Sequence, residues 1–235
     1  GVSFNYLNPA LAGLGVDTLT YTYKDLYTGC SDFRKTTVYI DSLPHVIAGN
    51  DTFRCTNDGV MTLGGQPAGV NGKWTGDGVL GTTYPYLFDP NVAGIGPHVL
   101  VYEYTNAAKC SDKDSMIITV YQTPVIKLTT PAAVCENDAA VDLIPYSNLK
   151  GGSWSWRTIT GRVSGTSIDP ADFKPSMSGK TDSTIMLRYD YHLGTSSNPM
   201  CPVADSVPLK INALPNPAVS TIDGKTTYCI NHGIV

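Results

Sequence analysis

Charged residues are scarce in this chain. They make up 15% of its 235 residues, and only two of the 20 acidic residues, Glu103 and Glu136, are glutamates. Threonine, glycine, proline, asparagine and aspartate are abundant instead, and these residues disfavour helices and suit short strands joined by turns. The net charge of −4 is spread along the chain without a basic run or an acidic tail. The composition predicts an all-β fold and no nucleic-acid partner.

Several sequence features that would signal other protein classes are missing. No apolar run is long enough for a transmembrane segment. No C-x-x-C pair occurs, which argues against structural zinc and thioredoxin-like chemistry. The four histidines are scattered without metal-ligand spacing, and Ser164 lacks the flanking glycine pattern of a hydrolase nucleophile. We therefore expect no enzyme, no catalytic residue, no metal site and no cofactor.

What the sequence does contain is a repeat with a period of about 80 residues. Tyr102 lies 81 residues after Tyr21, and Cys135 lies 80 residues after Cys55. The recurring elements are Asp/Asn-Pro-x-x-Ala-Gly-x-Gly, Tyr-x-Tyr, Cys-Ser-Asp, Cys-x-Asn-Asp and Gly-x-Trp. They occur as Asn8-Pro9 and Asp89-Pro90, Tyr21 and Tyr102, Cys30 and Cys110, Cys55 and Cys135, and Gly72-x-Trp74 and Gly152-x-Trp154. A looser further copy has Asp169-Pro170, Tyr189, Tyr191 and Cys201.

The repeat predicts four segments. Residues 1–44 form the C-terminal half of a repeat, 45–124 and 125–214 are complete repeats, and 215–235 begin a further one. Loop insertions are expected near 157–180 and 194–200, where the spacing grows. Because the chain starts within a repeat, without an initiator methionine or a signal peptide, we expect it to be part of a longer array.

Strand patterns within the repeat predict an immunoglobulin-like β-sandwich. Residues 18–23 alternate apolar or aromatic side chains with threonine, and 36–40 form a second strand after a turn at Thr28-Gly29. Residues 45–48 and 125–128 are expected to open the complete repeats as strands, with a turn-rich passage over 50–58. About seven short strands, one buried tryptophan and paired tyrosines on a late strand are typical of this sandwich.

The six cysteines recur with the repeat and indicate an oxidising, extracellular setting. The disulfide candidates are Cys55, Cys110, Cys135 and Cys201. Pairing within a repeat would join Cys55 to Cys110 and Cys135 to Cys201. Pairing between repeats would join Cys55 to Cys201, because the first cysteine lies at the bottom of its sandwich and the other at the top. Free thiols are the third possibility.

Two further features have a functional and a structural interpretation. Trp154 is expected in the core, because Trp74 repeats it, whereas Trp156 has no counterpart and is a candidate exposed aromatic for ligand contact. Aspartate followed by serine or threonine also recurs along the chain. The structural interpretation of these pairs is that they are common at turns and at the start of strands. The pairs are Asp17-Thr18, Asp41-Ser42, Asp114-Ser115, Asp182-Ser183 and Asp205-Ser206.

Together, the recurring motifs resemble the Ig-like repeats of giant gliding-motility adhesins on the surface of Bacteroidota. The resemblance implies export by type IX secretion, a long filament at the cell surface, and adhesion to a substratum while a motor moves the protein. It also implies that the Asp-Ser/Thr pairs are O-glycosylation sites, at Thr18, Ser42, Ser115, Ser183 and Ser206.

We therefore expect a stalk or adhesive segment of a very large extracellular adhesin used in attachment and gliding motility. The expected partners are a substratum or surface polysaccharide, together with the gliding and secretion machinery through other parts of the parent chain. The alternative is a non-catalytic spacer or a carbohydrate-binding module of a secreted polysaccharide-degrading enzyme.

Overall fold

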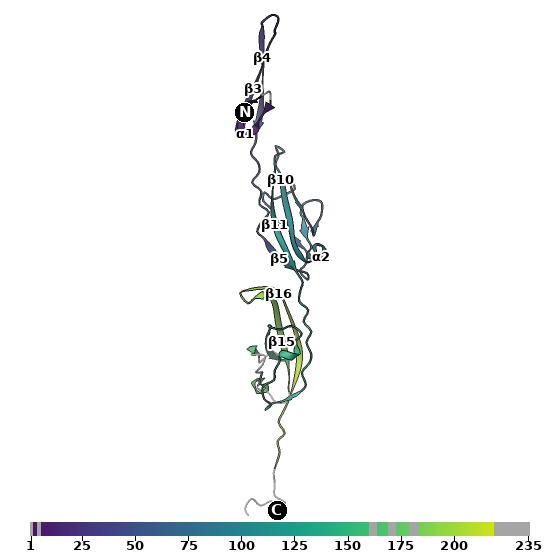
Figure 1. Cartoon of the computed structure of the whole chain (residues 1–235). Coiled ribbons are helices and arrows are strands. Elements are labelled where there is room, and N and C mark those ends of the chain that lie inside the picture. The colour runs from purple at the N-terminus through teal and green to yellow at the C-terminus, as the bar shows by residue number, and fades with distance from the viewer. Residues whose placement is uncertain (1, 4–5, 160–163, 169–172, 179–182, 219–235) are drawn as a thin grey trace, which may run out of the picture. The chain divides into compact units, whose positions relative to one another are not determined.

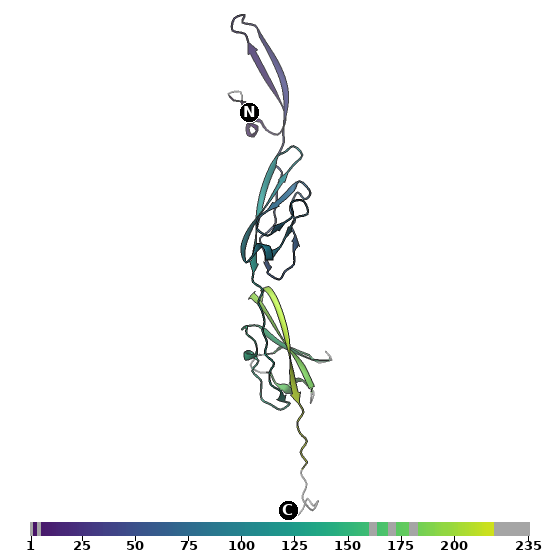
Figure 2. The same ribbon diagram turned by 90° about the vertical axis from the view of Figure 1, so that its right-hand side faces the viewer.

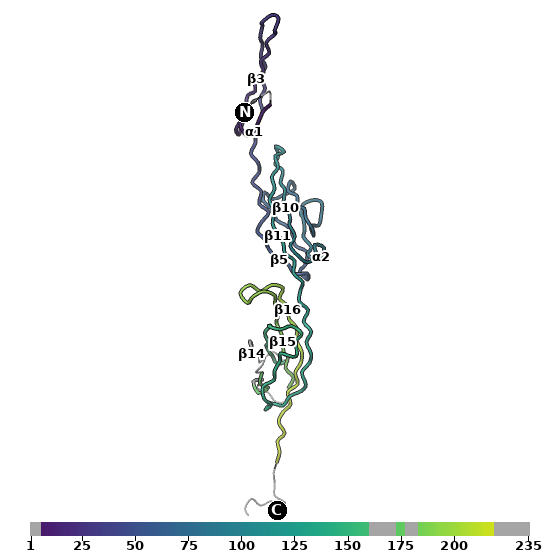
Figure 3. Tube along the Cα trace, viewed as in Figure 1, coloured from purple at the N-terminus to yellow at the C-terminus, as the bar shows by residue number. Residues whose placement is uncertain are grey.

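The computed structural model describes residues 2–3, 6–159, 164–168, 173–178 and 183–218. The chain forms two compact units, Gly1–Gln122 and Thr123–Val235. Figure 3 follows the chain through each unit from purple to yellow. The finer division at residues 44, 124 and 214 stays a prediction.

The first unit begins with a long hairpin. After the short pair β1 (Val2–Ser3) and β2 (Tyr6–Leu7) and the four-residue helix α1 (Pro9–Ala12), strand β3 (Gly15–Lys24) pairs antiparallel with β4 (Ser31–Ile40). Figure 2 shows these two strands as a twisted ribbon. Asp25 opens the connecting loop, where its Oδ1 accepts the backbone N–H groups of Tyr27 and Thr28 at 3.0 and 2.7 Å. The predicted hairpin is confirmed.

Residues 45–122 form a sandwich of two sheets (Figure 1). One sheet has the order β5-β11-β10-β7, with β5 at Thr52–Cys55, β7 at Gly72–Thr75, β10 at Gly96–Thr105 and β11 at Ser111–Tyr121. The other has the order β6-β9-β8, with β6 at Met61–Thr62, β8 at Val79–Leu80 and β9 at Leu87–Phe88. Phe88, Leu100 and Ile118 are fully buried in the core. These seven strands confirm the all-β, immunoglobulin-like sandwich.

The opening of this repeat differs from the prediction. Residues 45–48 form no strand, and Ile47 makes a single bridge to Gln66. The segment is held by the burial of Val46 and Ala48 against the core. The first strand in the main sheet is β5, within the stretch expected to be turns, because Thr52–Cys55 adds in parallel to the edge of β11.

The second unit has a five-stranded sheet in the order β12-β16-β15-β13-β14. Its strands are β12 (Val134–Cys135), β13 (Ser153–Thr158), β14 (Ser164–Ile168), β15 (Ser183–Thr195) and β16 (Asn198–Asn212), with 3-10 turns η1 (Ile144–Tyr146) and η2 (Pro175–Ser178). Trp154, Phe173 and Leu187 lie in its core. Here too the expected opening strand at 125–128 is only a bridge, from Leu128 to Ser147.

The inserted residues build β-structure where the sequence predicted loops. Strand β14 pairs antiparallel with β13 and extends the edge of the sheet. The second insertion lengthens the β15–β16 hairpin, with Leu193 opposite Met200 and Thr195 opposite Asn198. Pairing to an existing strand satisfies backbone groups that a loop would leave to solvent.

Candidate functional site

The Cys-x-Asn-Asp motif forms a tight turn at the end of the short parallel strand. In the first copy, Asp58 Oδ2 accepts the N–H of Cys55 at 2.9 Å, and the Asp58 N–H donates to the Cys55 carbonyl at 2.9 Å. In the second copy, Asp138 makes the same two bonds with Cys135, at 2.7 and 3.1 Å. The aspartate is therefore needed to close the turn, and the motif fixes where its cysteine lies.

The Gly-x-Trp motif packs against the late-strand tyrosine. The Trp74 and Tyr102 rings are 5.1 Å apart, and Trp154 and Tyr189 are 4.9 Å apart. A Cβ atom on Gly72 would overlap the Tyr102 phenol. Glycine is required there because the tyrosine ring lies directly on the backbone.

The Asp-Pro-x-x-Ala-Gly-x-Gly motif forms a capped turn of helix, which the sequence reasoning missed. Asp89 Oδ1 accepts the Asn91 N–H at 2.8 Å, ahead of α2 (Pro90–Ala93). Gly94 follows at φ 85° and Gly96 at φ 127°, in the region that favours glycine. The aspartate followed by proline, a combination typical of a helix N-terminus, could have predicted this turn of helix from the sequence.

The cysteines are in two oxidation states. Cys55 and Cys201 are disulfide-bonded and are 4% and 2% exposed. Cys30, Cys110 and Cys135 carry free thiols. Cys229 lies outside the described residues.

The pairing expected within a repeat is therefore wrong, and the sheet explains why. Cys55 is opposite Tyr121 at the end of β11, whereas Cys110 precedes Ser111 at its start. Ten residue steps along a strand span about 33 Å, whereas disulfide-bonded Cα atoms lie roughly 4.4–6.8 Å apart. Cys135 and Cys201 are separated in the same way, because Cys135 is opposite Asn212 at the far end of β16.

Trp156 does not form an exposed ligand contact. It is 5% exposed and lies in the core beside Trp154. The two side chains are two residues apart on β13 and therefore point to one face, a period that could have revealed its burial. Its indole Nε1 is buried without a hydrogen-bond partner among the described residues.

The candidate O-glycosylation residues are accessible to different degrees. Thr18, Ser42 and Ser115 are exposed, whereas Ser183 and Ser206 are partly buried. The carboxylates of Asp41 and Asp205 accept the N–H of the serine that follows, at 2.9 and 2.8 Å. Glycosylation of these residues stays a prediction.

The aspartate of one pair has a clear structural task. Asp114 Oδ2 accepts the Ala48 N–H at 2.9 Å and so ties the opening segment to β11. This bond, followed by that from the Ser115 backbone, lowers the pKa of Asp114.

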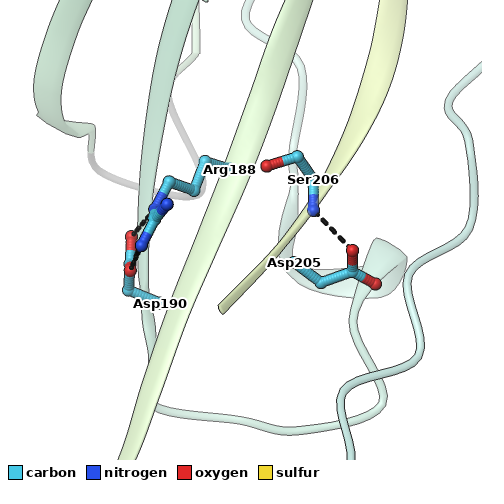
Figure 4. A network of polar contacts seen from close by, with 4 residues as sticks. All are labelled: Arg188, Asp190, Asp205 and Ser206. Carbon is cyan, nitrogen blue, oxygen red and sulfur yellow. Dashed lines mark hydrogen bonds and ion pairs between the residues drawn. The ribbon is translucent and has the colours of Figure 1, made fainter. Parts of the chain in front are cut away.

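The second unit has a groove of about 460 Å³ that the sequence did not predict. Its lining includes Gly152, Arg188, Asp190, Tyr191 and His192. Arg188 donates from Nε and Nη2 to the Asp190 carboxylate at 2.7–3.0 Å (Figure 4). Arg188 and Asp190 are two residues apart on one strand, and this spacing could have predicted that their side chains lie on the same face. Because Asp190 already holds the guanidinium, and raises its pKa, an anionic ligand would have to displace this carboxylate.

Among the residues that the structure describes, no group of three or more His, Cys, Asp or Glu side chains is placed to hold a metal ion. In the same part of the chain, no helix is long and apolar enough to cross a membrane.

No protein-family model matches the chain, and no curated protein matches it. Among solved structures, the chain is similar to Sidekick-1 immunoglobulin domains 1–5, with 9% identity and a TM-score of 0.36 over 82% of this chain and 45% of that one. It is also similar to a Ca2+-stabilized adhesin of an Antarctic ice-binding bacterium, with 12% identity and a TM-score of 0.33 over 86% and 58% of the two chains. Human mucin-like protocadherin EC1-2 gives 11% identity and a TM-score of 0.27 over 74% and 100%. At these scores the likenesses assign neither a family nor a function.

Proposed function

We propose that the chain is a load-bearing stalk and adhesive segment of a very large extracellular adhesin at the cell surface. Within this proposal the parent protein is exported by type IX secretion and serves attachment and gliding motility. Its partners are a substratum or surface polysaccharide, and other parts of the parent chain engage the gliding and secretion machinery.

The observation that carries the proposal is the parallel pairing of the first and last strands of the main sheet. β5 pairs in parallel with β11 over four residue positions, from Thr52 opposite Ile118 to Cys55 opposite Tyr121. β12 pairs in parallel with β16 in the second unit. Tension along the chain pulls β5 toward its start and β11 toward its end, so that their hydrogen bonds are loaded together in shear. Such an arrangement resists force better than strands that separate one bond at a time.

The repeated motifs support the same role. The Asp58 turn fixes the end of β5, and the bond from Ala48 to Asp114 anchors the segment that precedes it. In an array, weak contacts made by many similar repeats would add through multivalency. The ligand would then be bound by many weak contacts spread over the repeats and not by one deep site.

The test is to label live cells that make the protein with an antibody against residues 45–214 and to film the label. Label that travels along the cell surface is the expected result. Label that stays fixed, or is found only in the medium, would contradict the gliding assignment. An antibody against an unrelated fixed surface protein serves as the control for cell movement.

The parallel pairing also suits a spacer in a secreted polysaccharide-degrading enzyme. Recovery of the chain from the medium, attached to a catalytic domain, would favour that function. The carbohydrate-binding alternative relied on an exposed Trp156 for ligand contact, but this side chain is buried in the core.

A further inference from the structure

The groove of the second unit lies on the outer face of its main sheet. On β15, Arg188 and Asp190 alternate with Leu187 and Tyr189, which are buried in the core, so the charged residues point to the opposite face. The Arg188 and Asp190 side chains are 54% and 42% exposed. The outer face therefore presents a hydrogen-bonded guanidinium–carboxylate pair to solvent (Figure 4).

In the first complete repeat, long side chains flank the acidic residue at the same position. Glu103 follows Tyr102 and is opposite Lys73 on β7 and Lys113 on β11. Side chains of directly opposed residues lie on the same face of a sheet. Both lysines therefore stand beside Glu103 on the outer face.

In the second complete repeat, small residues take the places of both lysines. Asp190 is the counterpart of Glu103, and it is opposite Ser153 on β13 and Ala204 on β16. Gly152, next to Ser153, has no side chain. Because these residues are small, they leave the hollow beside the charged pair, and all three line the groove.

The added length of the β15–β16 hairpin supplies a further wall of the groove. Ser196, in the turn between the two strands, is one of the lining residues. The pairing register shifts between Tyr191 and Leu193, where the addition begins. Tyr191, His192 and Pro202 complete this side of the groove. The groove thus depends on residues that the first complete repeat does not share.

We propose that this groove binds a neutral saccharide through hydroxyl groups placed on the Arg188–Asp190 pair. The contacts from Arg188 Nε and Nη2 already neutralise the carboxylate, so an ion of either sign would have to break the pair. Among the described residues, Nη1 keeps its N–H groups free to donate, and the carboxylate keeps lone pairs that accept. Neighbouring hydroxyls of a sugar ring can accept from the one and donate to the other.

The size and the remaining lining of the groove suit the same ligand. Its volume of about 460 Å³ lies within the range of about 300–1,000 Å³ that is typical of small-molecule sites. The rings of Tyr191, His192 and Pro202 can pack against the C–H groups of a sugar. The inference rests on the proposed function, because it gives the polysaccharide partner a site and narrows that partner to neutral sugars. One weak site per chain would gain strength from multivalency.

The test is a titration of the purified full chain with neutral gluco-, manno- and galacto-oligosaccharides, followed by NMR of the backbone amides. We expect at least one of these sugars to shift the amides of residues 188–192 and 202–204, with a dissociation constant of about 1 mM. Asp190→Ala should weaken binding about tenfold or more, because a hydrogen bond to a charged group is lost. Ala204→Lys copies Lys113 of the first complete repeat and should abolish binding by filling the groove. Glu103→Ala, at the equivalent position outside the groove, is the matched control and should bind as the wild type does.

No shift with any of the three sugars at about 10 mM would overturn the proposal. Equal affinity of the wild type and Ala204→Lys would also overturn it, and this variant serves even if Asp190→Ala does not fold. Binding of sulfated or uronic-acid oligosaccharides alone would show that the ligand is anionic and would overturn it too. Sugar binding without a moving label on cells would contradict gliding and keep the saccharide site, whereas a moving label without sugar binding would do the reverse.

Discussion

At the scale of single residues, local hydrogen bonds and close packing explain several residues that recur in the repeat. Asp58 closes a turn, Asp89 caps a turn of helix, and Gly72 leaves room for Tyr102. The Tyr102 hydroxyl in turn donates to the Pro67 carbonyl at 2.6 Å. The sequence spacing of these residues is therefore set by the positions of the turn, the helix cap and the close contact in the sandwich.

Gly72→Ala is expected to destabilise the first unit strongly. The added methyl group would overlap the Tyr102 ring, and such overpacking costs about 1–3 kcal/mol or more in unfolding free energy. Denaturant unfolding of the full chain measures the change. Gly59→Ala is the matched control, because a Cβ there meets nothing within 4 Å. Equal midpoints for the two variants would show that the Tyr102 contact does not constrain Gly72.

Asp114→Asn is expected to weaken the pH dependence of stability at the acid end. The Ala48 and Ser115 N–H groups hold the pKa of Asp114 below its ordinary value of 3.8. A lowered carboxyl pKa contributes stability that is present above that ordinary value and is lost as the pH falls through the folded-state pKa. Thermal melts between pH 7 and pH 2 should show a lower melting temperature at neutral pH and a smaller acid loss in the variant.

Asp112→Asn removes one carboxylate from the same strand at an exposed position and is the control for net charge. An Asp114→Asn profile that runs parallel to the wild type over the whole range would contradict the assignment.

At the scale of the strand, neighbouring repeats fill one position in different ways. Trp156 is opposite Leu187 in β15. In the preceding repeat the equivalent position is Gly76, where a Cβ would collide with Leu100. The tryptophan is thus a core residue specific to one repeat, which is why comparison of the repeats did not reveal it.

Trp156→Ala is expected to cost about 3–5 kcal/mol of unfolding free energy, as for other large-to-small core changes. Trp156→Phe keeps much of the volume and removes the indole N–H that is buried without a partner among the described residues, so it should cost much less. Denaturant unfolding of the full chain, followed by tryptophan fluorescence, measures both. Wild-type stability in the alanine variant would contradict the burial of Trp156 in the core.

At the scale of the whole molecule, the direction of force decides how a repeat resists unfolding. Between residues 44 and 122, tension shears the parallel β5–β11 ladder. Between residues 95 and 122, the same tension separates β10 from β11 at their open end, starting from the pair Gly96 and Val120.

We expect a clearly lower unfolding force in the second direction, because hydrogen bonds then break one after another. Single-molecule pulling on the full chain, with attachment points at residues 44 and 122 or at 95 and 122, measures the difference. Reducing conditions in both cases remove any contribution of disulfides. Equal forces in the two directions would remove the mechanical basis of the proposed stalk function.

The sequence by itself determined the all-β class, the tandem repeat, the β3–β4 hairpin and the burial of Trp74 and Trp154. These are local or periodic properties, because alternation, turn residues and recurrence can be read without knowing which distant segments meet. The O-glycosylation candidates and the parent protein's role stay predictions.

Only the tertiary structure decided that Cys55 does not pair with Cys110, where Trp156 lies and which strand opens the main sheet. Each depends on pairing between residues far apart in sequence. β5 joins β11 because the end of the repeat returns beside its beginning, and that return places Cys55 and Cys110 at opposite ends of one strand. Sequence spacing gives the length of the intervening chain but not the direction in which the strands run.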